Sequence, residues 1–406
     1  MKILHVNFSD YLGGAAIAVN RINNSLINSG IDSKMVVSES LSGNENILSI
    51  KKTSESIKNL IKKSLSRKLK IFFSTDNKNT HSLNIVPSKL LKVINDYNAD
   101  VVNLHWIGNE TLSISDINKI KSKIVWTLHD MWPFVGAEHY TNDKRFIDGY
   151  TKLNRPKSEK GFDLNKFIWN KKIKNYSNIS KIIVTSGWMK NNAQKSYLFK
   201  KKLIKEIPLP IDQNFWKVEN QKFCKEQLGF KDFEKMIVFG ADNFSNNERK
   251  GFDFFLEVLK NDYFKDHNVL LFGDNNHLKI SKKLKNIKKN NRIKNLGLIN
   301  DKYSLKMIYS AADLIVIPSF TEAFGLIAQE AIHCGTPCVV FKNTGLESVI
   351  DHKKSGYTCE YNSIKDFTKG IDWCLTNLTN KDTISQIANS KFKTLKIIEQ
   401  YLDFIK

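Results

Sequence analysis

Short apolar runs that alternate with helical patterns constrain the fold of this chain more than any other feature. In the first half the runs are KILHVNF (2–8), SKMVVSE (33–39), DVVNLHW (100–106), KIVWTLH (123–129) and KIIVTS (181–186). Helical periodicity fills the segments between them. DVVNLHW and KIVWTLH are almost continuously apolar, as strands buried on both faces of a parallel sheet should be. The pattern predicts a doubly wound α/β domain.

The second half repeats this rhythm. Its runs are MIVFGAD (236–242), NVLLFGD (268–274), IKNLGL (293–298), DLIVIPS (313–319) and PCVVF (337–341). The length of 406 residues also favours two domains. We therefore predict a second α/β domain of the same kind.

The predicted boundary lies in LPIDQNFWKVENQKF, residues 209–223. This places an N-terminal domain at residues 1–210 and a C-terminal domain at residues 211–384. The remaining segment, ending in ISQIANSKFKTLKIIEQYLDFIK, has a helical pattern.

The chain is strongly basic, with 63 Lys and Arg against 41 Asp and Glu and a formal net charge of +22. Such an excess attracts nucleic acid, an anionic membrane surface or an anionic substrate. The basic residues lack the interleaved aromatic platform of single-strand binders, so we expect no nucleic-acid partner. None of the five cysteines forms a C-x-x-C pair, which predicts free thiols in a reducing compartment. The N-terminus reads as a strand and not as a signal peptide.

Residues 51–70 carry eight basic residues and one acid in the pattern of an amphipathic helix. Such a helix suits the surface of an anionic bilayer. An ordinary surface helix whose apolar face meets the core explains the pattern equally well. In the first interpretation the residues expected to contact the membrane are Lys58, Lys62, Lys63 and Arg67.

The stretch SFTEAFGLIAQEAIHCGTPCV (319–339) places two glutamates around the start of a helical pattern. Glu330 follows Glu322 by eight residues, about 12 Å at the helical rise per residue. The helix start favours a phosphate, and Gly325 permits close approach of a ligand to the backbone. Alternatively, Glu322 caps the turn and Glu330 faces solvent.

Three further positions are candidates for ligand contact. Arg249 and Lys250 precede Gly251 and an amphipathic helix, where two cations can hold a diphosphate. His129 follows a predicted buried strand, at the end of a sheet where α/β ligands bind. A solvated basic face and a structural histidine are the alternatives.

Gly14 belongs to a Gly-Gly pair after the first predicted strand. The pair does not complete a G-x-G-x-x-G fingerprint, although it still permits close approach of a phosphate. The chain has no Asp-x-Asp and no clustered His and Cys ligand set, so we expect no catalytic metal and no cofactor.

Taken together, these motifs resemble the retaining glycosyltransferases of family 4, which have the GT-B fold. The E-x7-E pattern of that family is met in TEAFGLIAQEA, and its basic element in RKGF, residues 249–252. TLHDMWPF, FIWNKK and TSGWMK resemble the subgroup that assembles bacterial exopolysaccharide and O-antigen, including colanic-acid enzymes. The resemblance implies two Rossmann-like domains that face each other across a cleft, with a terminal helix, about 385–406, that packs back on the N-terminal domain.

The resemblance also implies roles for individual residues. Arg249 and Lys250 would bind the diphosphate, Glu322 the donor sugar and Glu330 the ribose. His129 would approach the sugar, and Gly14 would lie under the diphosphate. The remaining donor contacts would be the Gly297-Leu298 loop at the base, and the amides of Phe324, Gly325 and Leu326 at the sugar or phosphate.

The chain departs from the subgroup pattern in three places. Residues 136–223 contain none of the cysteines often found after the HDMW element, so another arrangement must hold the polar segment 136–172. The acidic turn of the family appears as TGLES, with Ser348 or Glu347 at the acidic position. Leu209-Pro210 replaces the usual Asn-Gly before the linker.

The function that the resemblance implies is retaining transfer of a hexosyl unit from a UDP- or GDP-linked sugar to a saccharide, in bacterial surface polysaccharide synthesis. The basic surface fits a lipid-linked acceptor and a peripheral position on the cytoplasmic face of the cell membrane. Two alternatives are a nucleotide-sugar 2-epimerase of the same architecture, and a membrane- or nucleic-acid-binding protein without enzymatic activity. An epimerase needs no acceptor, and a nucleic-acid binder would show steep salt dependence.

Overall fold

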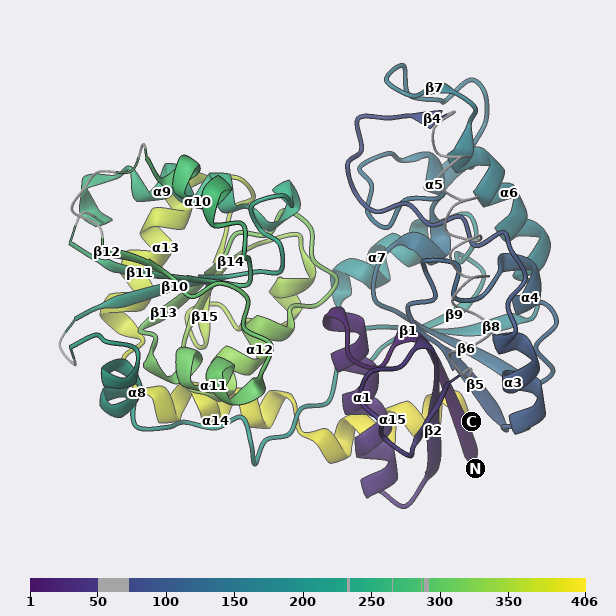
Figure 1. Ribbon diagram of the computed structural model, residues 1–406, viewed down its shortest axis with the longest axis horizontal. Coiled ribbons are helices and arrows are strands. Elements are labelled where there is room, and N and C mark those ends of the chain that lie inside the picture. Colours follow the sequence, from purple (N-terminus) through teal and green to yellow (C-terminus); the bar gives the residue numbers. More distant parts are fainter. Residues whose placement is uncertain (50–72, 232–233, 265, 286, 288–291) are drawn as a thin grey trace. The chain divides into compact units, whose positions relative to one another are not determined.

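The computed structural model describes residues 1–49, 73–231, 234–264, 266–285, 287 and 292–406. These residues separate into two compact units. The N-terminal unit comprises residues 1–210 together with 394–406, and the C-terminal unit comprises residues 211–393. Each unit has its own parallel sheet flanked by helices (Figure 1).

Seven parallel strands form the main sheet of the N-terminal unit, in the order β3-β2-β1-β5-β6-β8-β9. The strand order reverses between β1 and β5, and ligands of doubly wound sheets bind at the carboxyl ends beside such a reversal. The strands are β1 (Lys2–Ser9), β2 (Asp32–Glu39), β3 (Ile47–Ser49), β5 (Val101–Leu104), β6 (Lys123–Leu128), β8 (Ile179–Val184) and β9 (Leu203–Glu206).

Helices cover this sheet, and a separate two-stranded sheet lies apart from it. In this small sheet β4 (Phe73–Ser74) pairs with β7 (Lys160–Gly161) in antiparallel register. The helices are α1 (Gly13–Asn28), α3 (Leu90–Tyr97), α4 (Ile114–Ile117), α5 (Arg145–Asp148), α6 (Leu164–Asn175), α7 (Gly187–Lys195) and α15 (Thr394–Ile405).

Six parallel strands form the sheet of the C-terminal unit, in the order β12-β11-β10-β13-β14-β15. Here the order reverses between β10 and β13. The strands are β10 (Met236–Gly240), β11 (Asn268–Phe272), β12 (Arg292–Asn295), β13 (Leu314–Ile317), β14 (Cys338–Phe341) and β15 (Gly356–Cys359).

Two layers of helices enclose the sheet of the C-terminal unit (Figure 1). One layer holds α9 (Phe252–Leu259), α10 (His277–Leu284) and α13 (Ile364–Asn377). The other holds α8 (Gln221–Gln227), α11 (Lys302–Ala311), α12 (Leu326–His333) and α14 (Lys381–Lys391). The α/β class and the parallel, doubly wound sheets predicted from the sequence are confirmed. One predicted strand is shorter, since β12 ends at Asn295 and leaves Leu298 in a loop.

The returning C-terminal helix begins later than the predicted residue 385. Helix α14 stays with the C-terminal unit, because Ile384, Ser385 and Ala388 are buried there and Gln213 donates to the carbonyl of Asn389 at 3.0 Å. Only residues 394–406 return to the N-terminal unit. The boundary between the two units therefore falls between α14 and α15. The helical periodicity of the sequence does not reveal this boundary.

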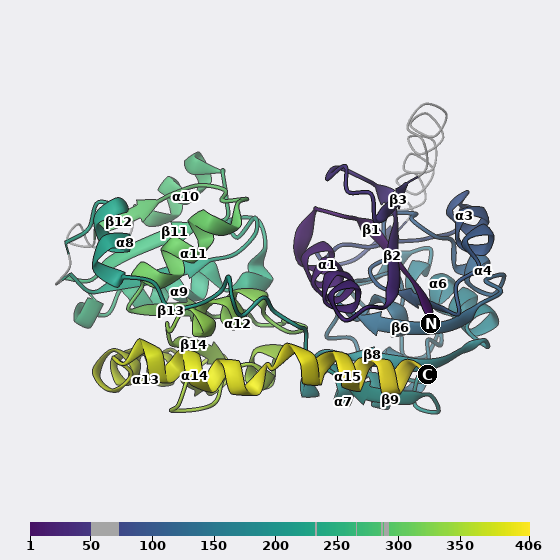
Figure 2. The same ribbon diagram turned by 90° about the horizontal axis from the view of Figure 1, so that it is seen from below.

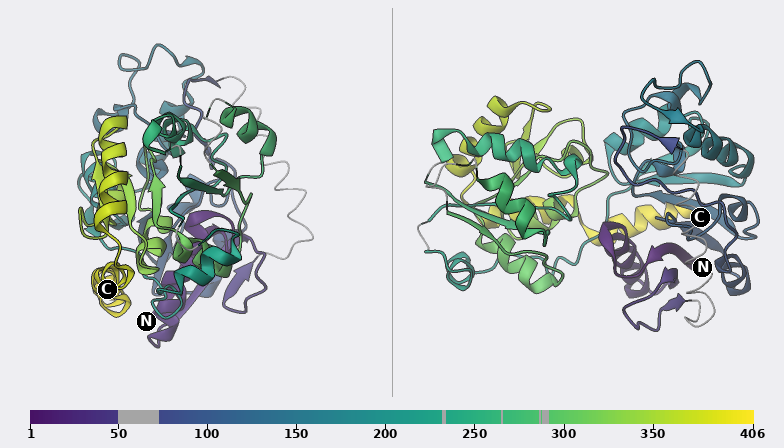
Figure 3. Two further views of the ribbon diagram at one scale, coloured as in Figure 1. Left: turned by 90° about the vertical axis from the view of Figure 1, so that its left-hand side faces the viewer. Right: turned by 45° about the horizontal axis from the view of Figure 1, so that its top comes forward.

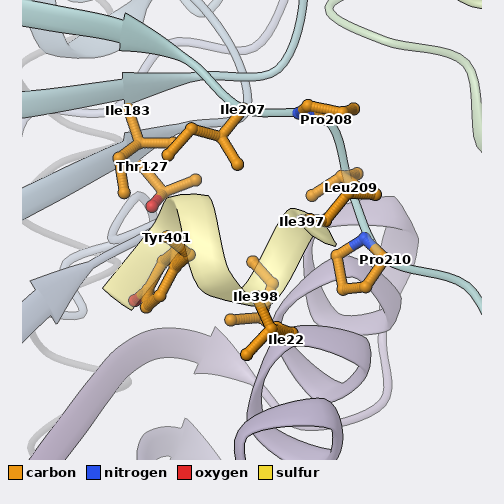
Figure 4. Close-up of a pocket in the computed structure, with 10 residues that line it drawn as sticks. All are labelled: Ile22, Thr127, Ile183, Ile207, Pro208, Leu209, Pro210, Ile397, Ile398 and Tyr401. Atoms are coloured by element: carbon orange, nitrogen blue, oxygen red, sulfur yellow. The ribbon is translucent and has the colours of Figure 1, made fainter. Parts of the chain in front are cut away.

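Helix α15 is amphipathic, and it packs on the N-terminal unit beside α1 (Figure 2). Asn103 of β5 donates to the hydroxyl of Tyr401 at 2.6 Å, and Lys123 of β6 donates to the carbonyl of Lys406 at 2.5 Å. Both chain ends therefore lie in this unit (Figure 3). Apolar side chains of α15, α1 and the segment Ile207–Pro210 line a small pocket (Figure 4).

Buried charges hold the cysteine-free segment 136–172. Arg145 pairs with Asp143 at 2.5 Å, with Glu159 at 2.7 Å and with Asp163 at 3.6 Å. Its guanidinium also lies 4.7 Å from the ring centre of Tyr150. These ion pairs hold α5 against the start of α6. They therefore stabilise the segment in which the family subgroup often has cysteines and this chain has none.

Lys172 of α6 anchors the other side of the same segment. Its fully buried ammonium group donates to the carbonyls of Val135 at 3.0 Å and Gly136 at 2.7 Å, and also to the carbonyl of Trp132. The ammonium nitrogen lies 3.9 Å from the ring centre of Trp132. One lysine therefore satisfies three carbonyl groups of the turn that follows β6.

We expect Lys172→Met to lower the free energy of unfolding by about 1–3 kcal/mol, because it leaves buried carbonyls without a donor. Urea denaturation followed by tryptophan fluorescence measures the change. Lys174→Met, at an exposed position of the same helix, is the matched control. Equal stability of the two variants would contradict the anchoring role.

Candidate active site

The loop that follows β13 carries Glu322 and enters α12 through Gly325. Gly325 has a φ of 111° at the N-cap, and no side chain caps the helix. A Cβ atom at this position would lie 2.3 Å from Cδ2 of Leu346. The first turn of a helix presents unpaired N–H groups and a partial positive charge. The start of α12 is therefore suited to an anion.

Arg249 and Lys250 reach this loop from the turn before α9. Nζ of Lys250 lies 2.6 Å from Oε2 of Glu322, and Nη1 of Arg249 lies 3.6 Å from the same oxygen. Arg249 also donates to the carbonyl of Thr321, and its own carbonyl accepts from the N–H of Phe320 at 2.8 Å. We call Arg249, Lys250 and Glu322 the charged cluster.

A glycine and an aromatic core bring the two segments together. Gly251 has a φ of 73°, and a Cβ atom there would lie 1.9 Å from the carbonyl oxygen of Pro318. Phe252 and Phe255 of α9 then pack on Phe239 of β10, with ring centres 5.3 and 5.4 Å apart. The packing of α9 on the sheet therefore fixes the position of the basic pair that precedes it.

The charges of the cluster control its ionisation. Burial is the largest single effect and raises the pKa of Glu322. The charges of Lys250 and Arg249, together with hydrogen bonds from Lys250 and from the N–H of Ala323, nevertheless bring that pKa below its ordinary value. Burial lowers the pKa of Lys250, and the carboxylate of Glu322 opposes that shift. Each side chain is 16 or 17% exposed, so a ligand can reach the cluster. Two cations against one carboxylate leave an excess of positive charge for an anion.

The TGLES turn packs against the same loop. The N–H of Gly345 donates to the carbonyl of Glu322 at 2.8 Å. A Cβ atom at Gly345 would lie 2.3 Å from the carbonyl oxygen of Ala323. The carboxylate of Glu347 accepts from the N–H of Asn343 at 2.9 Å, so Glu347 is already used to hold the turn.

Glu330 and Leu298 extend the candidate site along the sheet. Glu330 is 4% exposed on α12, so the alternative in which it faces solvent is wrong. Leu298 is exposed, and its N–H donates to Oδ1 of Asn275 at 2.7 Å. Two strands separate β12 from β13, which places the Leu298 loop roughly 14 Å from the Glu322 loop at the usual strand spacing. This separation suits an extended ligand.

Gly14 and His129 lie in the N-terminal unit. Gly14 is in the first turn of α1, the helix that follows β1, and His129 directly follows β6. The structure adds two residues that sequence reasoning missed. Nε2 of His129 lies 2.9 Å from Nδ1 of His105, and Nε2 of His105 lies 2.9 Å from Nδ1 of His5. Histidines in or just after three predicted strands were the available signal.

Asp130 does more than cap the turn after His129. One carboxylate oxygen accepts from the N–H of Trp132 at 2.9 Å. The other lies 2.5 Å from Nδ1 of His139 and 2.6 Å from the indole nitrogen of Trp106. Nε2 of His139 in turn lies 2.7 Å from the hydroxyl of Ser82. This buried network fixes the backbone next to His129.

Two of the predictions concern contact with a membrane and the lack of a metal site. Lys58, Lys62, Lys63 and Arg67 lie among residues 50–72, outside the described residues. Among the described residues, no helix has the length and apolar character needed to cross a membrane. In the same part of the chain, no group of three or more His, Cys, Asp or Glu side chains could hold a metal ion.

Residues 221–391 match the family model described as glycosyl transferases group 1. The matched residues lie within the C-terminal unit. The charged cluster, Leu298 and the segment from Phe324 to Glu330 all lie within the matched residues.

Relatives of known sequence include one protein of Klebsiella and one of Haemophilus. An uncharacterized 41.2 kDa protein in the cps region of Klebsiella pneumoniae is 23% identical over 413 residues, with 100% of this chain and 99% of the relative covered. An uncharacterized glycosyltransferase of Haemophilus influenzae is 30% identical over 161 residues, which are 37% of this chain and 44% of the relative. The chain thus spans less than half the length of the second relative.

Solved structures share the fold. Alr3699/HepE from Anabaena, in complex with UDP, has a TM-score of 0.66 at 15% identity and covers 99% of both chains. WaaG, described as a glycosyltransferase involved in lipopolysaccharide biosynthesis, has a TM-score of 0.65 at 15% identity, with 100% of this chain and 99% of WaaG covered. The likeness confirms the predicted GT-B fold class.

Proposed function

We propose that this protein is a retaining glycosyltransferase that moves a hexosyl unit from a UDP- or GDP-linked sugar to a saccharide acceptor. The observation that carries the proposal is the charged cluster at the start of α12, inside the segment that matches the glycosyl transferases group 1 model. The crystallised relative HepE binds UDP, which supports a nucleoside-diphosphate donor.

The charge distribution of the cluster matches the proposed reaction. In an oxocarbenium-like transition state, positive charge grows on the sugar and negative charge on the leaving diphosphate. Arg249, Lys250 and the helix start would stabilise the diphosphate from fixed positions, without a metal ion or cofactor. The leaving phosphate would take the proton of the acceptor hydroxyl as the new glycosidic bond forms on the same face.

The other residues of the candidate site would position the substrates. Glu322 would orient the donor sugar, Glu330 would bind the ribose hydroxyls, and the loop at Leu298 would contact the base. From the N-terminal unit, His129 would approach the sugar and Gly14 would lie under the diphosphate. The remaining donor contacts would be the backbone amides of Phe324, Gly325 and Leu326.

We further propose a lipid-linked acceptor in surface polysaccharide synthesis. The Klebsiella relative in a cps region and the role given for WaaG support this acceptor class. The net charge of +22 suits an anionic lipid diphosphate. The protein would then work at the cytoplasmic face of the membrane, as a peripheral protein.

Thermal shifts with UDP, GDP, CMP, NAD and a short DNA test the donor class. We expect a rise in Tm with UDP or GDP alone, equivalent to about 2.7 kcal/mol at a hundredfold excess over Kd. Lys250→Met should remove most of the rise, whereas Lys260→Met, at an exposed site on the same segment, should keep it. A salt-sensitive rise with DNA and none with either diphosphate would contradict the proposal.

A further inference from the structure

Three histidines on neighbouring strands form one hydrogen-bonded chain in the N-terminal unit. His5 lies within β1, His105 directly follows β5 and His129 directly follows β6. The backbone of His105 is fixed by the carbonyl of Val6 and by the indole N–H of Trp126, each at 2.9 Å. The chain therefore runs from the interior to the carboxyl edge of the sheet, where ligands of such sheets bind.

The ends of this chain differ. Nε2 of His5 is buried and has no hydrogen-bond partner among the described residues. His129 is only half-buried, and in the described part of the chain no hydrogen bond uses its Nδ1 atom. Nε2 of His5, at the inner end, is therefore buried without a partner, and Nδ1 of His129, at the outer end, can form a hydrogen bond with a ligand.

Neutral imidazole has one N–H donor and one acceptor nitrogen, so the chain can have only two proton arrangements. In the first, every Nδ1 carries the proton, and the chain ends in an N–H on His129 and a bare nitrogen on His5. In the second, every Nε2 carries the proton, and a buried N–H on His5 has no acceptor. Orphaned buried N–H groups are rarer than orphaned buried acceptors. The first arrangement is therefore favoured.

We infer that His5 and His105 are positioning residues that fix His129 in the neutral Nδ1–H tautomer, so that His129 presents a hydrogen-bond donor to an oxygen of a bound ligand. That the oxygen is a sugar hydroxyl rests on the proposed function. The tautomer itself follows from the contacts of the three rings.

A neutral donor suits the proposed chemistry better than an imidazolium ion. Positive charge grows on the sugar in the transition state, and a cationic ring beside it would oppose that growth. A neutral N–H still orients a hydroxyl group. A bare nitrogen at the same position would act as an acceptor or a base and would select a different partner.

The surroundings of the three rings favour their neutral forms. Burial lowers the pKa of His5 to about 3. Burial, then the neighbouring His5 and His129, lower the pKa of His105 well below its ordinary value. Burial lowers the pKa of His129 to about 4, and the charge of Asp130 acts in the opposite direction. The ring of Tyr401 in α15 also faces His5, with ring centres 6.4 Å apart.

Nitrogen NMR of the full-length protein labelled with ¹⁵N-histidine tests the inference directly. His129→Asn assigns the His129 signals by their loss. We expect a pyrrole-like shift at Nδ1 and a pyridine-like shift at Nε2, unchanged between about pH 5.5 and 8, where an ordinary histidine titrates. A pyridine-like Nδ1, or protonation of both nitrogens within this range, would overturn the inference.

Two variants separate positioning from general structural support. His5→Asn keeps a side-chain N–H near the former Nδ1 position, so the His129 tautomer should persist. His105→Phe removes both hydrogen bonds, so His129 should show mixed tautomers while burial keeps it neutral. An unchanged His129 in folded His105→Phe would overturn the positioning role. If that variant does not fold, the wild-type spectrum still decides.

This experiment is independent of the proposed transferase activity. The fixed tautomer with no response to UDP or GDP would sink the proposed function and keep the inference about His129. Donor binding together with an Nε2–H or charged His129 would support the proposed function and overturn the inference about His129.

Discussion

Glu322→Ala should lower turnover by about 10²–10³-fold, comparable with the loss of a fixed electrostatic group in other active sites. The carboxylate is held against Lys250 at 2.6 Å, which fixes its position in the loop before α12. Its removal frees both cations of the charged cluster. Affinity for UDP or GDP should therefore be kept or increased while kcat falls. Initial rates with a sugar nucleotide and acceptor, together with calorimetric Kd values, measure both quantities.

The matched control is Glu257→Ala, which removes an exposed carboxylate of α9 that pairs with Lys260 at 2.6 Å. It should leave kcat and Kd unchanged. Near-normal turnover by Glu322→Ala would sink the sugar-orienting role and reduce Glu322 to a counter-ion for Lys250. A parallel loss of kcat and nucleotide affinity would point instead to collapse of the loop.

The doubly wound architecture was predictable because its signal is local. A strand buried on both faces of a parallel sheet has a nearly continuous apolar run, and β5, β6, β10, β11 and β13 all have one. The loop before α12 was predictable for the same reason, since Glu322 and Gly325 lie within a few residues of each other. The alternation of strands and helices then fixes the end of the sheet at which they lie.

Contacts between distant segments were not predictable in this way. Lys250 and Glu322 are 72 residues apart and meet only because β10 and β13 are neighbours in the sheet. His5 and His105 are 100 residues apart and depend on the pairing of β1 with β5. The division between α14 and α15 is set by which unit buries each apolar face. Amphipathic periodicity shows that such a face exists, but it does not identify its partner.

Lys250→Met should make turnover sensitive to mild acid. In the wild type, burial raises the pKa of Glu322, and Lys250, Arg249 and the N–H of Ala323 together bring it below the ordinary value. Without Lys250, less attraction opposes the effect of burial, so the pKa of Glu322 rises. A carboxylate whose pKa rises is protonated at a higher pH as the solution is acidified. The acid limb of the profile of kcat/KM against pH should therefore move upward, in addition to a general loss of donor affinity.

The size of this movement separates the two cations. Arg249 remains 3.6 Å from Glu322 in the variant, so part of the stabilisation of the carboxylate persists. Arg249→Met should move the acid limb less than Lys250→Met does, because its contact with Glu322 is longer and its guanidinium also binds the carbonyl of Thr321. Glu322→Gln cannot titrate, so its acid limb should not respond to a further Lys250→Met substitution. An acid limb that moves equally with or without Glu322 would assign the titration to another group, and the ion pair would then have no part in the pH dependence.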